Sequence, residues 1–109
     1  MRKPDKLLGT LDLLVLRTLA GGDPIHGCAI ADRIHEMSRD ALRVEEGSLY
    51  PALHRMEQTG WVTSEWKPSA NNRRARYYRI TPAGRRRVAA IEREWTAHVN
   101  AVMRLLKLA

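Results

Sequence analysis

The sequence predicts a mainly α-helical fold with a small β-hairpin, in which a winged helix-turn-helix is followed by one long C-terminal helix. Two observations support this prediction. Three segments with helical spacing of apolar residues precede two short segments in which apolar and polar residues alternate. This is the order of elements in a winged helix, and a further helical pattern follows it. We therefore expect a winged helix-turn-helix domain at residues 1–81 and a dimerisation helix at residues 82–109.

The first helix is predicted over residues 7–20 (LLGTLDLLVLRTLA). It is apolar on nearly every side, so it is expected to be buried by more than one neighbour. Thr10 is a suitable N-cap, and Asp12 then lies in the first turn, where the helix dipole favours a negative charge. Gly21 and Gly22 end this helix.

The second helix is predicted over residues 26–38, and Ile30, Ile34 and Met37 form its apolar stripe. Residues 39–43 form a connector, after which Val44 is predicted to form a short edge strand. The third helix begins near Gly47 or Ser48, with Pro51 in the first turn, and ends at Gly60. Its apolar stripe repeats at helical spacing and should face the core: Leu49, Leu53 and Met56.

Residues 61–67 and 76–80 alternate in polarity and predict a β-hairpin around the polar loop 68–74. Val62, Ser64 and Trp66 share one side of the first strand, and Tyr78 and Ile80 of the second strand point inward. Two strands are only marginally stable alone, so this hairpin must pack on the helices.

The last helix begins with Thr81 as N-cap and Pro82 at its first position. A helix that runs from there to residue 109 is roughly 40 Å long. A domain of this size cannot cover the whole apolar stripe of such a helix, so a second copy of the chain is expected to cover the rest. The predicted homodimer interface is this stripe: Val88, Ile91, Trp95, Val102 and Leu105.

The positive charge of the chain is concentrated in one segment. The formal net charge is +7, and residues 66–91 contain eight basic residues and no acidic one. The other residues nearly balance, with 11 basic and 12 acidic side chains. A concentrated positive field attracts a polyanion, although a run of solvated charges is the simpler alternative. Because the basic segment coincides with the predicted hairpin, we favour nucleic-acid binding by residues 1–81.

Several stretches together resemble the PadR family of bacterial transcriptional regulators. They are residues 11–16 (LDLLVL), His26-Gly27 followed by Ile30 and Ile34, residues 46–57 (EGSLYPALHRME) with Gly60-Trp61, residues 76–81 (RYYRIT), and Gly84. The single C-terminal helix is similar to that of the shorter subgroup of the family. Cys28 departs from the pattern, because the family usually has an aromatic residue there. The resemblance implies a homodimeric repressor of a target operon that a small molecule or stress signal releases, often at detoxification or efflux genes.

Six side chains are the candidates for contact with a double-stranded DNA operator: Ser48, Tyr50, His54 and Arg55 on the third helix, and Arg74 and Arg76 on the hairpin. Helix residues of this kind read the major groove, and hairpin arginines bind phosphates or the minor groove. Each has a simpler alternative, since Tyr50 can pack on the hairpin, Ser48 can cap its helix, and the arginines can be solvated.

Trp95 is the candidate for binding an effector. Two-fold symmetry would bring two copies of its ring together, and such rings can flank a small planar apolar molecule. The alternative is that Trp95 is ordinary dimer core.

No catalytic or cofactor motif is present in the sequence, and we expect no enzyme activity, cofactor or metal. The four histidines match no zinc-binding spacing. The single cysteine, Cys28, is expected to be a buried inert thiol rather than a nucleophile. No apolar run is long enough to span a membrane, and residues 1–6 do not resemble a signal peptide, so a cytoplasmic location is expected.

Two alternatives to the DNA-binding regulator remain. An RNA-binding winged helix would use the same basic hairpin without needing a two-fold dimer. A protein-interaction module would not need the basic hairpin at all, and salt would affect its binding little. The sequence indicates neither the operator, the effector nor the direction of regulation.

Overall fold

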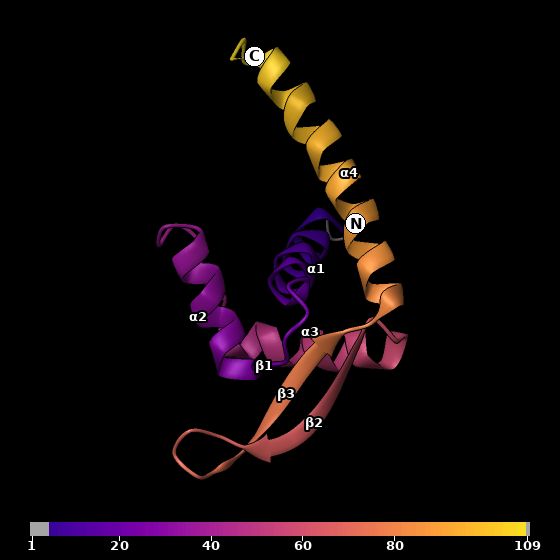
Figure 1. The fold of residues 1–109 in the computed structure, drawn as a ribbon. Coiled ribbons are helices and arrows are strands. Elements are labelled where there is room, and N and C mark those ends of the chain that lie inside the picture. The colour runs from indigo at the N-terminus through magenta and orange to yellow at the C-terminus, as the bar shows by residue number, and fades with distance from the viewer. Residues whose placement is uncertain (1–4, 109) are drawn as a thin grey trace.

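The chain folds into four helices and a small sheet, with α4 as the longest element (Figure 1). This computed structural model describes residues 5–108, with side chains from residue 10 onward. The elements are α1 (Asp5–Leu19), β1 (Ile25–His26), α2 (Gly27–Met37), α3 (Glu46–Thr59), β2 (Val62–Pro68), β3 (Arg74–Ile80) and α4 (Pro82–Leu105). The predicted order of three helices, a hairpin and a long helix is confirmed. Residues 1–4 and Ala109, the last residue of the predicted helix, lie outside the described residues.

The sheet has three antiparallel strands in the order β1-β3-β2. In the hairpin, Val62 pairs with Ile80 and Pro68 pairs with Arg74. The edge strand predicted at Val44 is wrong, because Val44 lies in the coil between α2 and α3. Ile25 takes that edge instead, paired with Tyr78, and its side chain is buried there.

Polar groups define the start of two helices. The Oγ1 atom of Thr81 accepts a hydrogen bond from the backbone N–H of Gly84 at 3.0 Å, which confirms the predicted N-cap of α4. His26 caps α2, since its Nδ1 atom accepts from the N–H of Cys28 at 3.0 Å. Thr10 is not an N-cap, because α1 begins five residues earlier, at Asp5.

The beginning of α4 lies close against the chain at Trp61. A Cβ atom on Gly84 would collide with the carbonyl oxygen of Trp61 and would approach Cγ1 of Ile80 to 2.8 Å. The hydroxyl of Thr81 donates to the carbonyl of Gly60 at 2.6 Å, next to the same contact. A glycine at position 84 therefore allows α4 to start directly against the end of α3.

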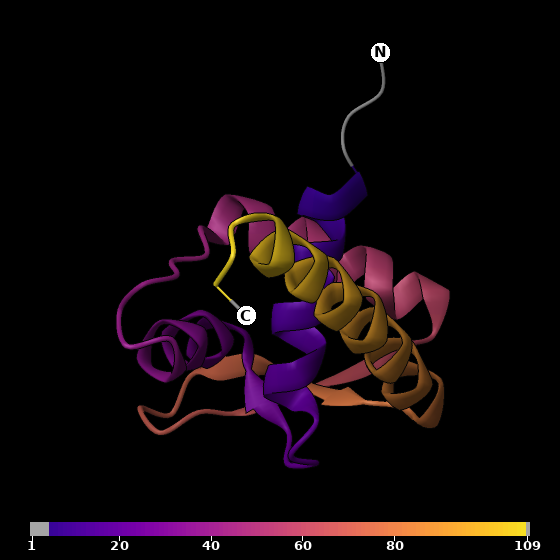
Figure 2. The same cartoon turned by 90° about the horizontal axis from the view of Figure 1, so that it is seen from above.

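The core forms around α1, which lies between α2 and α4 in both views (Figures 1 and 2). Three side chains of α1, Val15, Leu16 and Leu19, are fully buried. The other elements each contribute buried side chains: Ile25, Ile30, Ile34, Leu49, Ala52, Leu53, Met56, Val62, Tyr78, Ile80, Val88 and Ile91. The apolar stripe predicted for α3 is confirmed as core.

The apolar stripe of α4 is divided between two environments. Val88 and Ile91 are 5% and 2% exposed within the chain's own core, so their assignment to a dimer interface is wrong. Trp95 packs partly against that core. Val102 and Leu105 are exposed on the half of α4 that projects away from the hairpin (Figure 1). The predicted boundary between the winged domain (residues 1–81) and the C-terminal helix (residues 82–109) therefore does not coincide with a break in the core.

A partly buried ion pair joins α1 to α3. The carboxylate of Asp12 accepts hydrogen bonds from Nη2 and Nη1 of Arg55 at 2.9 and 3.1 Å. Asp12 is only 4% exposed, although it sits in an otherwise apolar helix. Arg55 thus satisfies a charge that α1 buries, and the pair holds the two helices in one register.

Arg55→Ala is expected to lower the free energy of unfolding by about 3 kcal/mol, because it leaves the Asp12 carboxylate buried without a partner. Urea denaturation followed by circular dichroism, at one protein concentration, measures this loss. His54→Ala is the control, since this neighbouring side chain is exposed and its loss should change stability by less than about 0.5 kcal/mol. Equal stability of the two variants would show that the pair does not hold α1 to α3.

Candidate nucleic-acid interface

The outward face of α3 is formed by side chains that repeat every three or four residues. Leu49, Leu53 and Met56 face the core, so the exposed residues of α3 include Ser48, Tyr50 and His54. These three predicted contact residues are therefore accessible. The fourth, Arg55, points toward α1, where both of its terminal nitrogens donate to Asp12, and its role as a groove contact stays a prediction. Hydrogen bonding to that carboxylate raises the pKa of Arg55.

Tyr50 lies where α3 meets the beginning of α2. Its ring packs so closely on Gly27 that a Cβ atom there would come within 2.8 Å of the phenol. Its hydroxyl oxygen is 3.5 Å from Sγ of Cys28. Burial raises the pKa of Tyr50, so the phenol stays protonated and able to donate a hydrogen bond. Tyr50 thus packs on the beginning of α2, and 37% of it remains exposed.

Cys28 is exposed, which contradicts the expectation of a buried thiol. It is the second residue of α2, and its S–H group donates to Oε2 of Glu46 over 3.8 Å. Cys28 points outward because α2 turns its apolar side, with Ile30 and Ile34, toward the core. Helical periodicity agrees, since Cys28 lies two residues before Ile30 and so on the opposite side of the helix, whereas composition alone suggests a buried thiol.

The hairpin β2–β3, which we call the wing, combines exposed aromatic rings with cations. The guanidinium of Arg74 lies 5.8 Å from the centre of the Trp66 ring, and Nζ of Lys67 lies 5.0 Å from that of Tyr77. Trp66 is 52% exposed. In the described part of the chain no carboxylate pairs with Arg74, so its charge is available to a ligand. The wing therefore presents groups that suit a polyanion with flat bases.

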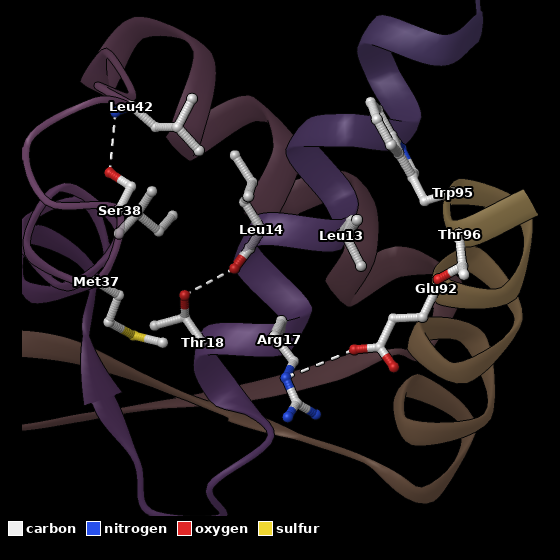
Figure 3. Close-up of a pocket in the computed structure, with 11 residues that line it drawn as sticks. Leu13, Leu14, Arg17, Thr18, Met37, Ser38, Leu42, Glu92, Trp95 and Thr96 are labelled. Carbon is white, nitrogen blue, oxygen red and sulfur yellow. Dashed lines mark hydrogen bonds and ion pairs between the residues drawn. The ribbon is translucent and has the colours of Figure 1, made fainter. Parts of the chain in front are cut away.

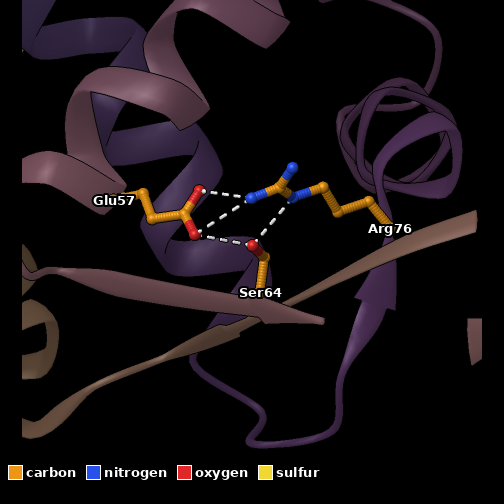
Figure 4. Close-up of polar contacts among 3 residues, drawn as sticks. All are labelled: Glu57, Ser64 and Arg76. Carbon is orange, nitrogen blue, oxygen red and sulfur yellow. Dashed lines mark hydrogen bonds and ion pairs between the residues drawn. The ribbon is translucent and has the colours of Figure 1, made fainter. Parts of the chain in front are cut away.

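Arg76 is tied into a network between the wing and α3 (Figure 4). Its Nε atom donates to Oγ of Ser64 at 2.8 Å, and Nη2 donates to the carboxylate of Glu57 at 3.3 and 3.4 Å. The Ser64 hydroxyl donates to Oε2 of Glu57 at 2.7 Å. Arg76 is therefore not the freely solvated charge of the simpler alternative. Glu57 is not among the predicted site residues, although it lies seven residues after Tyr50 and so on the same side of α3.

Part of the basic segment has an internal role at the beginning of α4. Nη1 of Arg85 donates to the carbonyl of Ala20 at 3.0 Å, and the guanidinium of Arg87 lies 5.1 Å from the Trp61 ring centre. These contacts fasten α4 to the end of α1 and to the chain after α3.

An apolar groove of about 440 Å³ lies between α1, α2 and α4 (Figure 3). Its apolar lining comes from all three helices and the turn after α2: Leu13, Leu14, Ile34, Met37, Leu42 and Trp95. Met37 was expected to face the core, but it is exposed at this groove. The Arg17–Glu92 ion pair, at 3.5 Å, borders the opening. Trp95 thus lies beside a cavity of the size that small molecules occupy.

Among residues 5–108, no three His, Cys, Asp or Glu side chains lie close enough together to hold a metal ion. No helix in this range is long and apolar enough to cross a membrane.

Known proteins resemble this chain in sequence. Residues 15–90 match the Transcriptional regulator PadR-like family. The transcriptional regulator Rv3488 of Mycobacterium tuberculosis is 42% identical over 66 residues, which are 61% of this chain and 58% of that protein. The chain thus aligns with little more than half the length of this relative.

Solved structures share the fold over nearly the whole chain. A transcriptional regulator from Clostridium thermocellum has a TM-score of 0.80 and 27% identity, with 92% of this chain and 96% of that one covered. A PadR family transcriptional regulator from Eggerthella lenta has a TM-score of 0.77 and 30% identity, with coverage of 96% and 88%. Both structures therefore share the fold of the present chain.

Proposed function

The chain belongs to the PadR-like family of transcriptional regulators, and from this we propose that it represses a target operon by binding a double-stranded DNA operator as a homodimer. The observation that carries the proposal is the position of two elements. The outward face of α3, with Ser48, Tyr50 and His54, lies beside the wing, where Arg74 pairs with no carboxylate of residues 5–108. A helix in the major groove and a cationic hairpin on the adjacent backbone would use both surfaces together.

The chemistry of these side chains indicates which part of the DNA each would contact. Tyr50 and His54 carry hydrogen-bonding groups on the face that would enter the groove, so they would read base edges. Arg74 would neutralise a phosphate, and Ser48 at the first turn of α3 would donate to another. In a two-fold dimer the two α3 helices would occupy successive major grooves, roughly 34–36 Å apart.

Arg74→Gln is expected to lower affinity for all duplex sequences and to reduce the slope of log K against log salt by about one, because one phosphate contact is lost. His54→Ala should instead weaken binding to the footprinted site more than binding to random DNA. Footprinting upstream of the protein's own gene, followed by fluorescence anisotropy at several salt concentrations, measures both effects.

Lys107→Gln is the charge-matched control, because this exposed lysine lies beyond the far end of α4. It should leave the salt slope unchanged. Preference for RNA over duplex DNA would favour the RNA-binding alternative, and binding of a protein without salt dependence would favour the interaction module. Identical behaviour of all three variants would show that α3 and the wing are not the binding surface.

The exposed half of α4 supports the homodimer. Val102 and Leu105 lie on the same side of the helix as Trp95, and they are 40% and 80% exposed. Val99 lies beside them and is also exposed. A second copy would cover this apolar surface, and a two-fold axis is the commonest way for a soluble protein to do so. Trp95, Val102 and Leu105 remain from the predicted interface, whereas Val88 and Ile91 belong to the monomer core.

Val102→Glu combined with Leu105→Glu is expected to give a folded monomer, because the charges disrupt the interface and leave the monomer core intact. Size-exclusion chromatography with light scattering at micromolar concentration measures the mass. Ala97→Glu is the control on the opposite side of α4 and should remain dimeric. A monomeric wild type, or a dimeric double variant, would contradict this interface.

Release of the repressor would involve a small planar apolar molecule that binds beside Trp95. The indole ring borders the apolar groove, and a two-fold dimer would bring a second indole near it. A ligand there would change DNA binding only if it prefers one orientation of the two winged domains.

Planar aromatic compounds are expected to quench Trp95 fluorescence saturably and to weaken operator binding. The variant Trp61→Tyr with Trp66→Tyr leaves Trp95 as the single tryptophan and assigns the signal. If a broad panel of such compounds produces no quenching, Trp95 is dimer core and the effector binds elsewhere.

A further inference from the structure

We propose that Glu57 and Ser64 are positioning residues, which hold the guanidinium of Arg76 so that its free edge can bind a DNA phosphate between α3 and the wing. This inference rests on the proposed DNA binding and adds to it the residues that prepare the phosphate contact. It combines three observations: a closed hydrogen-bond network, an unused edge of the guanidinium, and the place of the network in the fold.

The network leaves each of its members little freedom. The Ser64 hydroxyl donates its single proton to Glu57 at 2.7 Å and accepts from Nε of Arg76 at 2.8 Å. Both carboxylate oxygens of Glu57 accept from Nη2 of Arg76. The Trp66 ring lies against the guanidinium, with its centre 5.5 Å away. An arginine held by two polar partners and a ring has already lost the rotamer freedom that ligand binding would otherwise remove.

The network uses only part of the guanidinium. Arginine has five N–H donors in one plane, and Glu57 and Ser64 engage only Nε and Nη2. Figure 4 shows the third nitrogen, Nη1, pointing away from both partners and making no drawn contact. The Arg76 side chain is 41% exposed. Nη2 carries two N–H groups, and the one on the Nε side faces Glu57 and Ser64. Its second N–H and those of Nη1 therefore remain available on the opposite edge, and such an edge matches two oxygens of a phosphate.

The network also lies at the junction that the DNA backbone would follow. Glu57 belongs to α3 and lies one turn beyond His54. Ser64 lies on β2 and Arg76 on β3, where Arg76 pairs with Trp66. One guanidinium thus connects the recognition helix to both strands of the wing. A phosphate bound there would contact a site whose position relative to α3 is already set.

Charge and positioning predict opposite effects of one substitution. Glu57→Gln removes a negative charge beside the phosphate path, so electrostatics alone predicts tighter DNA binding. A glutamine amide has one acceptor oxygen and brings an NH₂ group toward donors that need an acceptor. If Glu57 positions Arg76, affinity for duplex DNA should therefore fall, by roughly threefold to tenfold.

The experiment compares five variants with the wild type by fluorescence anisotropy on one duplex at one salt concentration. Glu57→Gln and Ser64→Ala should both weaken binding, the second without any change of charge. Glu65→Gln is the charge-matched control, because Glu65 lies on β2 and pairs with Lys67 at 3.9 Å rather than with Arg76. It should bind as tightly as the wild type or more tightly. In an Arg76→Lys background, Glu57→Gln should cause no further loss.

The outcomes separate this inference from the proposed function. If the wild type binds and Glu57→Gln binds as Glu65→Gln does, or loses affinity equally in the Arg76→Lys background, the positioning role is overturned and DNA binding stands. If the wild type binds no duplex, the proposed function is overturned and the inference with it. Circular dichroism melting confirms that each variant is folded at the temperature of the assay.

Discussion

The carboxylate of Asp12 is buried between α1 and α3, where both terminal nitrogens of Arg55 donate to it. A buried carboxylate costs several kcal/mol unless a cation and hydrogen bonds compensate it. The packing of α3 on α1 is therefore restricted to arrangements in which Arg55 reaches Asp12. Apolar contacts of Leu49 and Leu53 alone would tolerate small rotations of α3. The ion pair narrows the rotation of α3 further, whereas the burial of Leu49, Leu53 and Met56 already defines its inward face.

The central position of α1 connects α3 to α4. The same helix contacts α2, α3, β3 and α4, so the exposed half of α4 and the outward face of α3 are both attached to it. Val15, Leu16 and Leu19 have no exposed surface, and close-packed side chains of this kind transmit displacement rather than absorb it. A change in the angle of α4 therefore has a short rigid route to α3. The apolar groove beside Trp95 lies along this route.

Positive charge serves two purposes in this fold. Arg85 and Arg87 fasten the beginning of α4, and Arg55 compensates a buried carboxylate. Arg74 lies over the Trp66 ring and forms no ion pair among residues 5–108, and Arg76 is held by Ser64 and Glu57. The amino-acid composition alone does not distinguish between these arginines. Their surroundings separate those that stabilise the chain from those that a polyanion can reach.

The sequence alone determined the order of the elements, the core face of α3 and the capped start of α4. These features depend on contacts within a few residues, such as Thr81 with Gly84, or on periodicity along one helix. Only the tertiary structure decided which neighbour covers each face. Arg55 binds Asp12, which is 43 residues away in the sequence, and Arg76 binds Glu57, which is 19 residues away. Ile25 rather than Val44 forms the edge of the sheet. Val88 and Ile91 continue into Val102 and Leu105 as one stripe, yet the core is only long enough to bury the first two. Spacing shows which side chains share a face, whereas the partner of that face depends on how distant segments pack.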